Sequence, residues 1–182
     1  KVVGYNYREK AIELGFSGRD DHLIQTIEDG SFDLVLFSKC NRVNYSVFEQ
    51  ATSITKTCLW FMDPLASYDL EMKTKTGIVH YFCCDKKDVL EEARKINENS
   101  FHVCEGFDTR NDFPCDVAKE HEVTFLGNVY GDRAELLKKI QREIHIKNSA
   151  YGKEHAIEVS KSIVNLNICT DRSASDRVYK VL

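Results

Sequence analysis

Short apolar runs alternate with segments of helical spacing along most of this chain. Near-continuous apolar runs predict strands of a parallel sheet, and apolar residues three and four positions apart predict helices. The strands predicted in the first part of the chain cover residues 32–37, 57–62, 78–84 and 101–104. The helices predicted there cover residues 8–14, 20–30, 44–53 and 86–97. This alternation predicts an α/β unit whose parallel sheet has helices on both faces.

The pattern is interrupted between residues 105 and 122, where acidic residues are frequent and no apolar period is present. It resumes at Val123, with strands predicted at 123–126, 144–146 and 163–168 and helices at 132–142 and 153–160. The expected organisation is a first Rossmann-like domain at 1–109, a linker at 110–122 and a second domain at 123–182. The second domain is expected to be incomplete, as part of a longer polypeptide, because two or three strands cannot close their own core.

A strand, a glycine turn and a helix are predicted in succession at the start of the second domain. The apolar run at 123–126 ends at Gly127 and Asn128, and a helical period begins after Asp132. The first amide groups of such a helix and the positive end of its dipole can hold a diphosphate. Asp132 can cap the helix, and Arg133 adds donors suited to phosphate. An ordinary turn with Arg133 in solvent is the alternative interpretation, because a glycine turn alone is a weak signal.

The composition narrows the possible partners. The chain has 182 residues, 42% of them hydrophobic, and a net charge of -4, so it can bury a core and is not expected to bind nucleic acid. No apolar run approaches the roughly 20 residues that span a bilayer, and we expect a cytoplasmic protein without a transmembrane segment. Most of the seven cysteines lie in strand-like runs, and no Cys/His cluster has zinc spacing, so no metal site is expected.

Polar residues that follow predicted strands are the candidates for function, because open α/β sheets bind ligands at the carboxyl ends of their strands. We expect the two domains to share a cleft at these ends. Asp63 follows the second strand and can accept a proton from a hydroxyl group. The cations Arg133, Lys161 and Arg172 can offset the charge of a phosphate leaving group. Structural roles are the alternative for Asp63, which precedes a proline, and for Lys161, near a helix end.

Six segments follow one another in the order found in a known enzyme family. They are FDLVLFSK at 32–39, LWFMDP at 59–64, EGFD at 105–108, FLGNVYGDR at 125–133, SKSIVNLN at 160–167 and DRVY at 176–179. As an ordered set they resemble the CgeB-like (spore maturation protein) glycosyltransferases, which are similar to group 1 enzymes of the GT-B fold. The resemblance runs from Phe32 to the end of the chain.

The resemblance implies a nucleotide-diphospho-sugar bound mainly on the second domain and an acceptor bound mainly on the first, without a metal or other cofactor. Gly127 and Asn128 would lie beside the donor phosphates, with Arg133 close to them. Arg177 corresponds to the arginine of the family's Arg-x-Phe-Glu segment. Lys180 stands where that segment commonly has the glutamate that holds the donor ribose, and an ammonium group cannot accept those hydrogen bonds. The ribose is then held otherwise, the donor is unusual, or the copy is inactive.

The sequence therefore predicts a metal-independent glycosyltransferase that moves a sugar from a nucleotide-diphospho-sugar to a hydroxyl group of a glycan, a protein or a small molecule. Asp63 is the candidate general base. The candidate donor-binding residues are Gly127, Asn128, Arg133, Lys161, Arg172 and Arg177. Two alternatives remain, a non-catalytic nucleotide or sugar-nucleotide binding module, which Lys180 favours, and an α/β protein-interaction domain.

Overall fold

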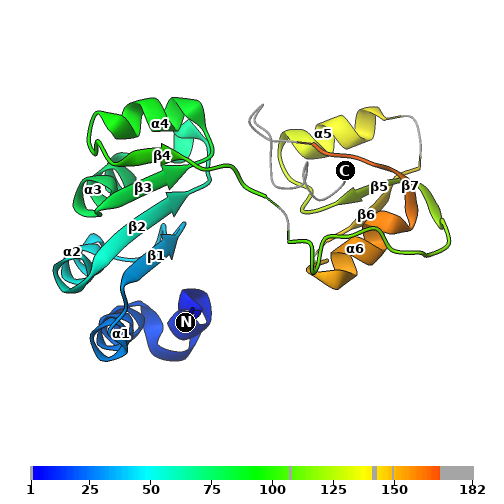
Figure 1. Cartoon of the computed structure of the whole chain (residues 1–182). Coiled ribbons are helices and arrows are strands. Elements are labelled where there is room, and N and C mark those ends of the chain that lie inside the picture. Colours follow the sequence, from blue (N-terminus) through cyan, green and yellow to red (C-terminus); the bar gives the residue numbers. More distant parts are fainter. Residues whose placement is uncertain (1, 107, 141–142, 149, 169–182) are drawn as a thin grey trace. The chain divides into compact units, whose positions relative to one another are not determined.

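The computed structural model describes residues 2–106, 108–140, 143–148 and 150–168 (Figure 1). The chain divides into two compact units, which we call unit 1 (residues 1–104) and unit 2 (residues 105–182). Both units are α/β with parallel sheets, as predicted. The predicted linker, 110–122, belongs to unit 2.

Unit 1 contains a four-stranded parallel sheet in the order β1-β2-β3-β4. The strands are β1 (Leu34–Ser38), β2 (Lys56–Phe61), β3 (Tyr81–Cys84) and β4 (Ser100–His102). The helices are α1 (Tyr7–Gly30), α2 (Tyr45–Ile54), α3 (Leu70–Ile78) and α4 (Lys87–Arg94), with a short 3-10 helix, η1 (Leu65–Ser67). Each strand therefore pairs only with strands that are next to it in the sequence.

The ends of the helices in unit 1 follow from particular side chains. Asn44 precedes α2, and its side chain accepts a hydrogen bond from the backbone N–H of Ser46. Asp69 caps α3 in the same way, which satisfies an N–H that has no partner within the helix. Gly15 lies inside α1 with φ 73° and ψ 174°, a conformation that is essentially restricted to glycine. The helix is kinked there, between the two helices predicted at 8–14 and 20–30.

Two predictions for the middle of unit 1 are wrong. Helix α3 was not predicted, and Ile78, predicted to begin the third strand, is its last residue, while β3 begins at Tyr81. The buried face of α3 includes Lys75 and Thr76 besides Met72, so its apolar residues do not have helical spacing. Ile78 and Val79 then precede the strand directly and extend its apolar run towards the helix.

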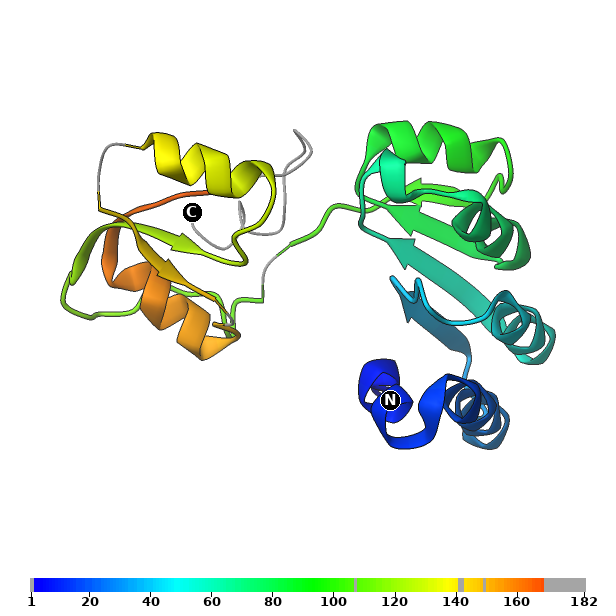
Figure 2. The same cartoon turned by 180° about the vertical axis from the view of Figure 1, so that it is seen from behind.

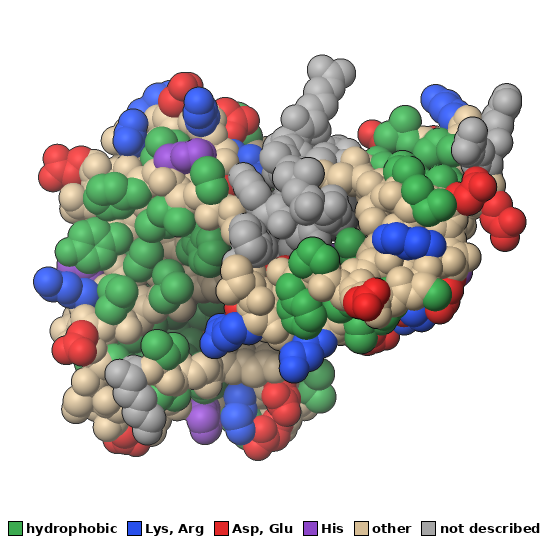
Figure 3. Space-filling model, turned by 45° about the vertical axis from the view of Figure 1, so that its right-hand side comes forward, with side chains coloured by type: hydrophobic (Ala, Val, Ile, Leu, Met, Phe, Trp, Pro, Cys, Tyr) green, Lys and Arg blue, Asp and Glu red, His purple; other side chains and the backbone are tan. Residues whose placement is uncertain are grey.

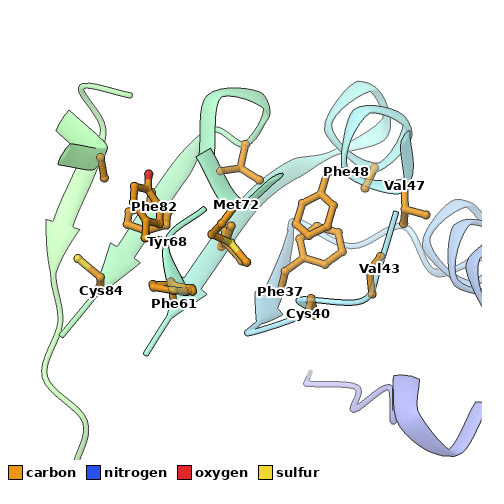
Figure 4. Close-up of a cluster of buried hydrophobic side chains, with 14 of the residues drawn as sticks. Phe37, Cys40, Val43, Val47, Phe48, Phe61, Tyr68, Met72, Phe82 and Cys84 are labelled. Atoms are coloured by element: carbon orange, nitrogen blue, oxygen red, sulfur yellow. The ribbon is translucent and has the colours of Figure 1, made fainter. Parts of the chain in front are cut away.

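The core of unit 1 lies between its sheet and its helices, and Figure 4 shows part of it. Phe37 of β1 packs against Phe48 of α2, with ring centroids 4.2 Å apart. Phe82 of β3 packs against Tyr68, which follows η1, with ring centroids 5.7 Å apart. Other fully or nearly fully buried members are Val43, Val47, Leu59, Phe61, Met72 and Val89. Strands β1, β2 and β3 thus contribute alternate residues to this core, and β4 contributes none.

The opposite face of this sheet does not carry the predicted helices in the described part of the chain. Strands that pair in sequence order through right-handed crossovers place their helices on the same side of the sheet (Figures 1 and 2). Leu34, Leu36 and Phe101 remain 50%, 54% and 48% exposed. Hydrophobic side chains lie close together on the visible face of the unit at the left of Figure 3. The prediction of helices on both faces is therefore wrong for the described residues of unit 1.

Unit 2 contains a three-stranded parallel sheet in the order β6-β5-β7. Its strands are β5 (His121–Leu126), β6 (His145–Lys147) and β7 (Ser162–Asn165), and its helices are α5 (Asp132–Lys139) and α6 (Lys153–Ser160). These elements confirm the predicted alternation. Part of the predicted linker packs against them, since Lys119 Nζ donates hydrogen bonds to the carbonyl oxygens of Ser160 and Ser162 at 2.7 and 2.8 Å.

Candidate functional site

A pocket of about 570 Å³ lies in unit 1 where β1 and β2 end. Its polar lining consists of Arg8 and Arg19 of α1, Lys39, Asn41 and Arg42 of the loop after β1, and Asp63 after β2. Apolar and aromatic residues of α1 complete the lining. The pocket therefore lies at the carboxyl end of a parallel sheet, where the sequence predicted function. We call it the unit 1 pocket.

The loop after β1 has an unusual backbone. Lys39 and Cys40 have φ values of 61° and 50°, in the left-handed region that residues other than glycine seldom adopt. Each such residue costs on the order of 1 to 3 kcal/mol, and it persists where the surroundings hold it in place. The N–H of Lys39 donates to the carbonyl oxygen of Trp60 at 2.9 Å, and the N–H of Val43 donates to that of Cys40 at 3.1 Å.

A buried lysine donates hydrogen bonds to the backbone of the same loop. Lys75 of α3 has no exposed surface, and its Nζ donates to the carbonyl oxygens of Cys40 and Asn41 at 3.4 and 3.2 Å. Its charge is balanced by Glu71, whose Oε1 lies 2.6 Å from Nζ. A buried ammonium group requires such partners because removing it from water is costly. Lys75 therefore fixes the loop that forms one wall of the unit 1 pocket.

Asp63 is held at the edge of the pocket by two neighbours. Lys39 Nζ lies 2.7 Å from its Oδ1, and Asn41 Nδ2 donates to its Oδ2 at 3.3 Å. Each carboxylate oxygen can accept more than one hydrogen bond, so the group can still accept a proton or a hydroxyl hydrogen. The structure therefore brings the predicted Asp63 together with polar residues from the exit of the neighbouring strand.

The guanidinium group of Arg19 forms the inner wall of the pocket. Arg19 is 1% exposed, and it donates to Asp20 Oδ1 and to the carbonyl oxygen of Arg42, both at 2.7 Å. It also lies over the ring of Phe16, with Cζ 5.3 Å from the centroid. Arg42 itself has an exposed side chain at the pocket rim. Nothing in the sequence distinguished Arg19 or Lys75 from the charged residues that helices normally direct into solvent.

The predicted strand, glycine turn and helix of unit 2 are present. Gly127 follows β5 with φ 142°, and its N–H donates to the carbonyl oxygen of Lys147 at 3.0 Å, so this amide group extends the sheet. Asn128 is exposed. Gly131, with φ 50°, precedes α5 and supplies no side-chain cap. Asp132 is the first residue of the helix, so the prediction that it caps the helix is wrong.

One interpretation of the sequence placed Arg133 in solvent, and the structure contradicts it. It is 6% exposed, and its Nε donates to the carbonyl oxygen of Ile168 at 2.9 Å. Its Nη1 donates to that of Asn128 at 3.2 Å. The guanidinium carbon also lies 5.0 and 5.9 Å from the ring centroids of Tyr130 and Phe125. Arg133 thus joins the turn after β5 to the segment after β7.

Lys161 lies at the amino end of the parallel strands of unit 2, and Gly127 lies at their carboxyl end. It directly precedes β7, whereas Gly127 directly follows β5, and the two strands are parallel. Its Nζ lies 3.3 Å from Glu120 and 3.4 Å from Glu158, and the hydrogen bond with Glu120 raises the pKa of Lys161. The structure therefore does not bring Lys161 to the Gly127 turn. Arg172, Arg177 and Lys180 lie outside the described residues.

Within the described ranges, no group of three or more His, Cys, Asp or Glu side chains is arranged to hold a metal ion. None of the helices described there has the length and apolar character needed to cross a bilayer. A comparison with protein-family models gave no match, and a comparison with curated protein sequences gave none either.

Proposed function

We propose that this chain is part of a glycosyltransferase of the GT-B type that moves a sugar from a nucleotide-diphospho-sugar to a hydroxyl group. The observation that supports this most directly is the position of Asp63. Its carboxylate lines a pocket at the carboxyl end of a parallel sheet and is oriented by Lys39 and Asn41. The acceptor hydroxyl binds in the unit 1 pocket in this proposal, and Asp63 takes its proton as the oxygen attacks the anomeric carbon.

The donor diphosphate is assigned to the turn after β5. Gly127 and Gly131 both have positive φ, so the turn has no side chain at two places where backbone and ligand can approach each other. The positive end of the α5 dipole then stabilises the leaving group. Arg133 supports this site indirectly, because its hydrogen bonds to Asn128 and Ile168 fix the turn.

The test measures donor use by the full-length protein. Purified protein is incubated with UDP-, GDP- and ADP-linked sugars and a panel of hydroxyl acceptors, and release of nucleoside diphosphate is measured. We expect Asp63→Asn to lower turnover by about 10² to 10⁴-fold, the usual contribution of a general base, without abolishing donor binding in calorimetry. Asp21→Asn, at an exposed aspartate of α1, is the matched control. Turnover that survives Asp63→Asn unchanged excludes the assigned base.

A non-catalytic nucleotide or sugar-nucleotide binding module is the second candidate. Several groups at the donor site already have partners within the protein. The Gly127 N–H pairs with Lys147, and the guanidinium of Arg133 binds two carbonyl oxygens. The backbone N–H groups of Arg133 and Ala134 donate to the carbonyl oxygens of Tyr130 and Gly131. This arrangement favours binding without strong stabilisation of a leaving group. Binding of nucleoside diphosphates with no turnover on any acceptor would support the module. Absence of nucleotide binding would contradict both candidates and favour a protein-interaction domain.

A further inference from the structure

The unit 1 pocket is richer in cations than an acceptor site for a neutral sugar requires. Four basic residues line it, Arg8, Arg19, Lys39 and Arg42, against one carboxylate, Asp63. A second carboxylate, Asp20, does not line the pocket and is paired with Arg19. The local balance is therefore positive, although the chain as a whole has a net charge of -4. A pocket of opposite sign to the whole molecule attracts anions specifically.

The distribution of partners shows where an anion can bind. Arg19 is satisfied by Asp20 and the carbonyl oxygen of Arg42, and Lys39 is paired with Asp63. The side chain of Arg42 is exposed, and it forms no ion pair with any other residue that the structure describes. Its guanidinium group therefore offers its donors to a ligand at the rim of the pocket, without first breaking an ion pair of the protein.

The position of Arg42 is also held by the fold. Its carbonyl oxygen accepts a hydrogen bond from the buried Arg19, and the carbonyl oxygen of Asn41 just before it accepts one from the buried Lys75. Cys40, two residues earlier, has a positive φ that this network maintains. A strained loop held by two buried cations is typical of a binding site that is formed before the ligand arrives.

We infer that the unit 1 pocket binds a small molecule that carries a phosphate group together with hydroxyl groups. The phosphate binds to Arg42 and neighbouring cations, because the planar fork of a guanidinium group matches phosphate oxygens and a phosphate carries nearly two negative charges. A hydroxyl group of the same molecule binds to Asp63. The volume of about 570 Å³ is within the range of small-molecule sites. That this molecule is the acceptor of sugar transfer rests on the proposed function. That it binds in the unit 1 pocket does not.

The experiment is calorimetry on the full chain at low salt with three probes of similar shape: glucose 6-phosphate, glucose and glucuronate. We expect glucose 6-phosphate to bind at least tenfold more tightly than the other two. Arg42→Ala should weaken that binding by about 10 to 100-fold, the usual loss of a hydrogen bond to a charged group. Arg42→Lys should restore it only in part, because lysine keeps the charge and loses the fork. Lys56→Ala, at the amino end of β2, is the matched control.

Because the side chain of Arg42 is exposed, its variants are expected to fold, and Trp60 fluorescence checks this in unit 1. Glucose that binds as tightly as its phosphate ester, or binding unaffected by Arg42→Ala, overturns the inference. Equal affinity for glucuronate overturns the choice of phosphate over carboxylate. Phosphate-dependent binding without any sugar transfer contradicts the proposed function and leaves this inference standing. Transfer of sugar to neutral acceptors, with no preference for phosphorylated ones, supports the proposed function and overturns this inference.

Discussion

The guanidinium group of Arg133 allows a sharp test of how the turn after β5 is held. Replacing Arg133 by Ala removes two hydrogen bonds from a charged donor, one to Ile168 and one to Asn128. Such bonds contribute about 1.5 to 3 kcal/mol each. The carbonyl group of Asn128 belongs to an exposed residue and regains a water partner, so the loss is reduced. We therefore expect unit 2 to be destabilised by about 2 to 4 kcal/mol.

Hydrogen exchange read by mass spectrometry measures this loss where it occurs. Peptides from β5 and α5 should exchange about 30 to 1,000-fold faster in Arg133→Ala, because every 1.4 kcal/mol corresponds to a factor of ten. Trp60, the only tryptophan, lies in β2 and reports on unit 1 separately. Arg133→Met keeps most of the aliphatic volume and loses the donors, so its difference from the alanine variant isolates the contribution of packing.

The matched control is Arg110→Ala in the same unit. The side chain of Arg110 is 86% exposed and forms an ion pair with Asp108, and an exposed pair of this kind contributes little to stability. Exchange that changes by less than threefold in Arg133→Ala would refute the role assigned to Arg133 as a structural support. Lost nucleotide binding in that variant, accompanied by faster exchange, should accordingly be attributed to the turn and not to a missing phosphate contact.

Three further predictions concern other parts of the chain. Gly15→Ala should destabilise the first half of α1 by about 2 kcal/mol, because its φ and ψ suit only glycine, and unchanged hydrogen exchange in that half would refute this. Iodoacetamide at pH 8 should modify the exposed Cys104 much faster than Cys40, since burial raises the pKa of the Cys40 thiol to about 11; equal rates in peptide mapping would contradict it. Arg110 lowers the pKa of Asp108 from 3.8 to about 2, so the stabilisation from this pair should be complete above pH 3.8 and disappear as the pH falls to about 2. An NMR titration of that carboxyl group with a midpoint near 3.8 would exclude the interaction.

Strands and helices with regular apolar spacing were predictable, and one helix without that spacing, α3, was not. Helix α6 was predicted with the boundaries that the structure has, Lys153–Ser160. Helix α3 was missed because Lys75 and Thr76 occupy its buried face. A lysine in the sequence normally indicates a solvated position, and its burial depends on carbonyl groups 34 and 35 residues away. Such long-range partners are not encoded in local spacing.

In the candidate site too, some residues could be identified from the sequence and others could not. Asp63 was identifiable because it follows an apolar strand, and the structure places it in a pocket. The roles of Arg19 and Arg133 were not identifiable, since each depends on backbone carbonyl groups of other elements. For unit 1, the prediction of helices on both sheet faces was wrong for a related reason. The near-continuous apolar runs gave the type of element, but the order of the strands decides on which side of the sheet the helices lie.

The pairing of β1 to β4 in sequence order also bears on how unit 1 forms. Each strand joins a neighbour only about 20 residues away along the chain, so every pairing closes a short loop at small entropic cost. A growing chain can therefore add one strand and one helix at a time while it leaves the ribosome. In unit 2, β5 also pairs with the next strand, β6, but its other edge stays unpaired until β7 has been made, because His121 pairs with Ser162.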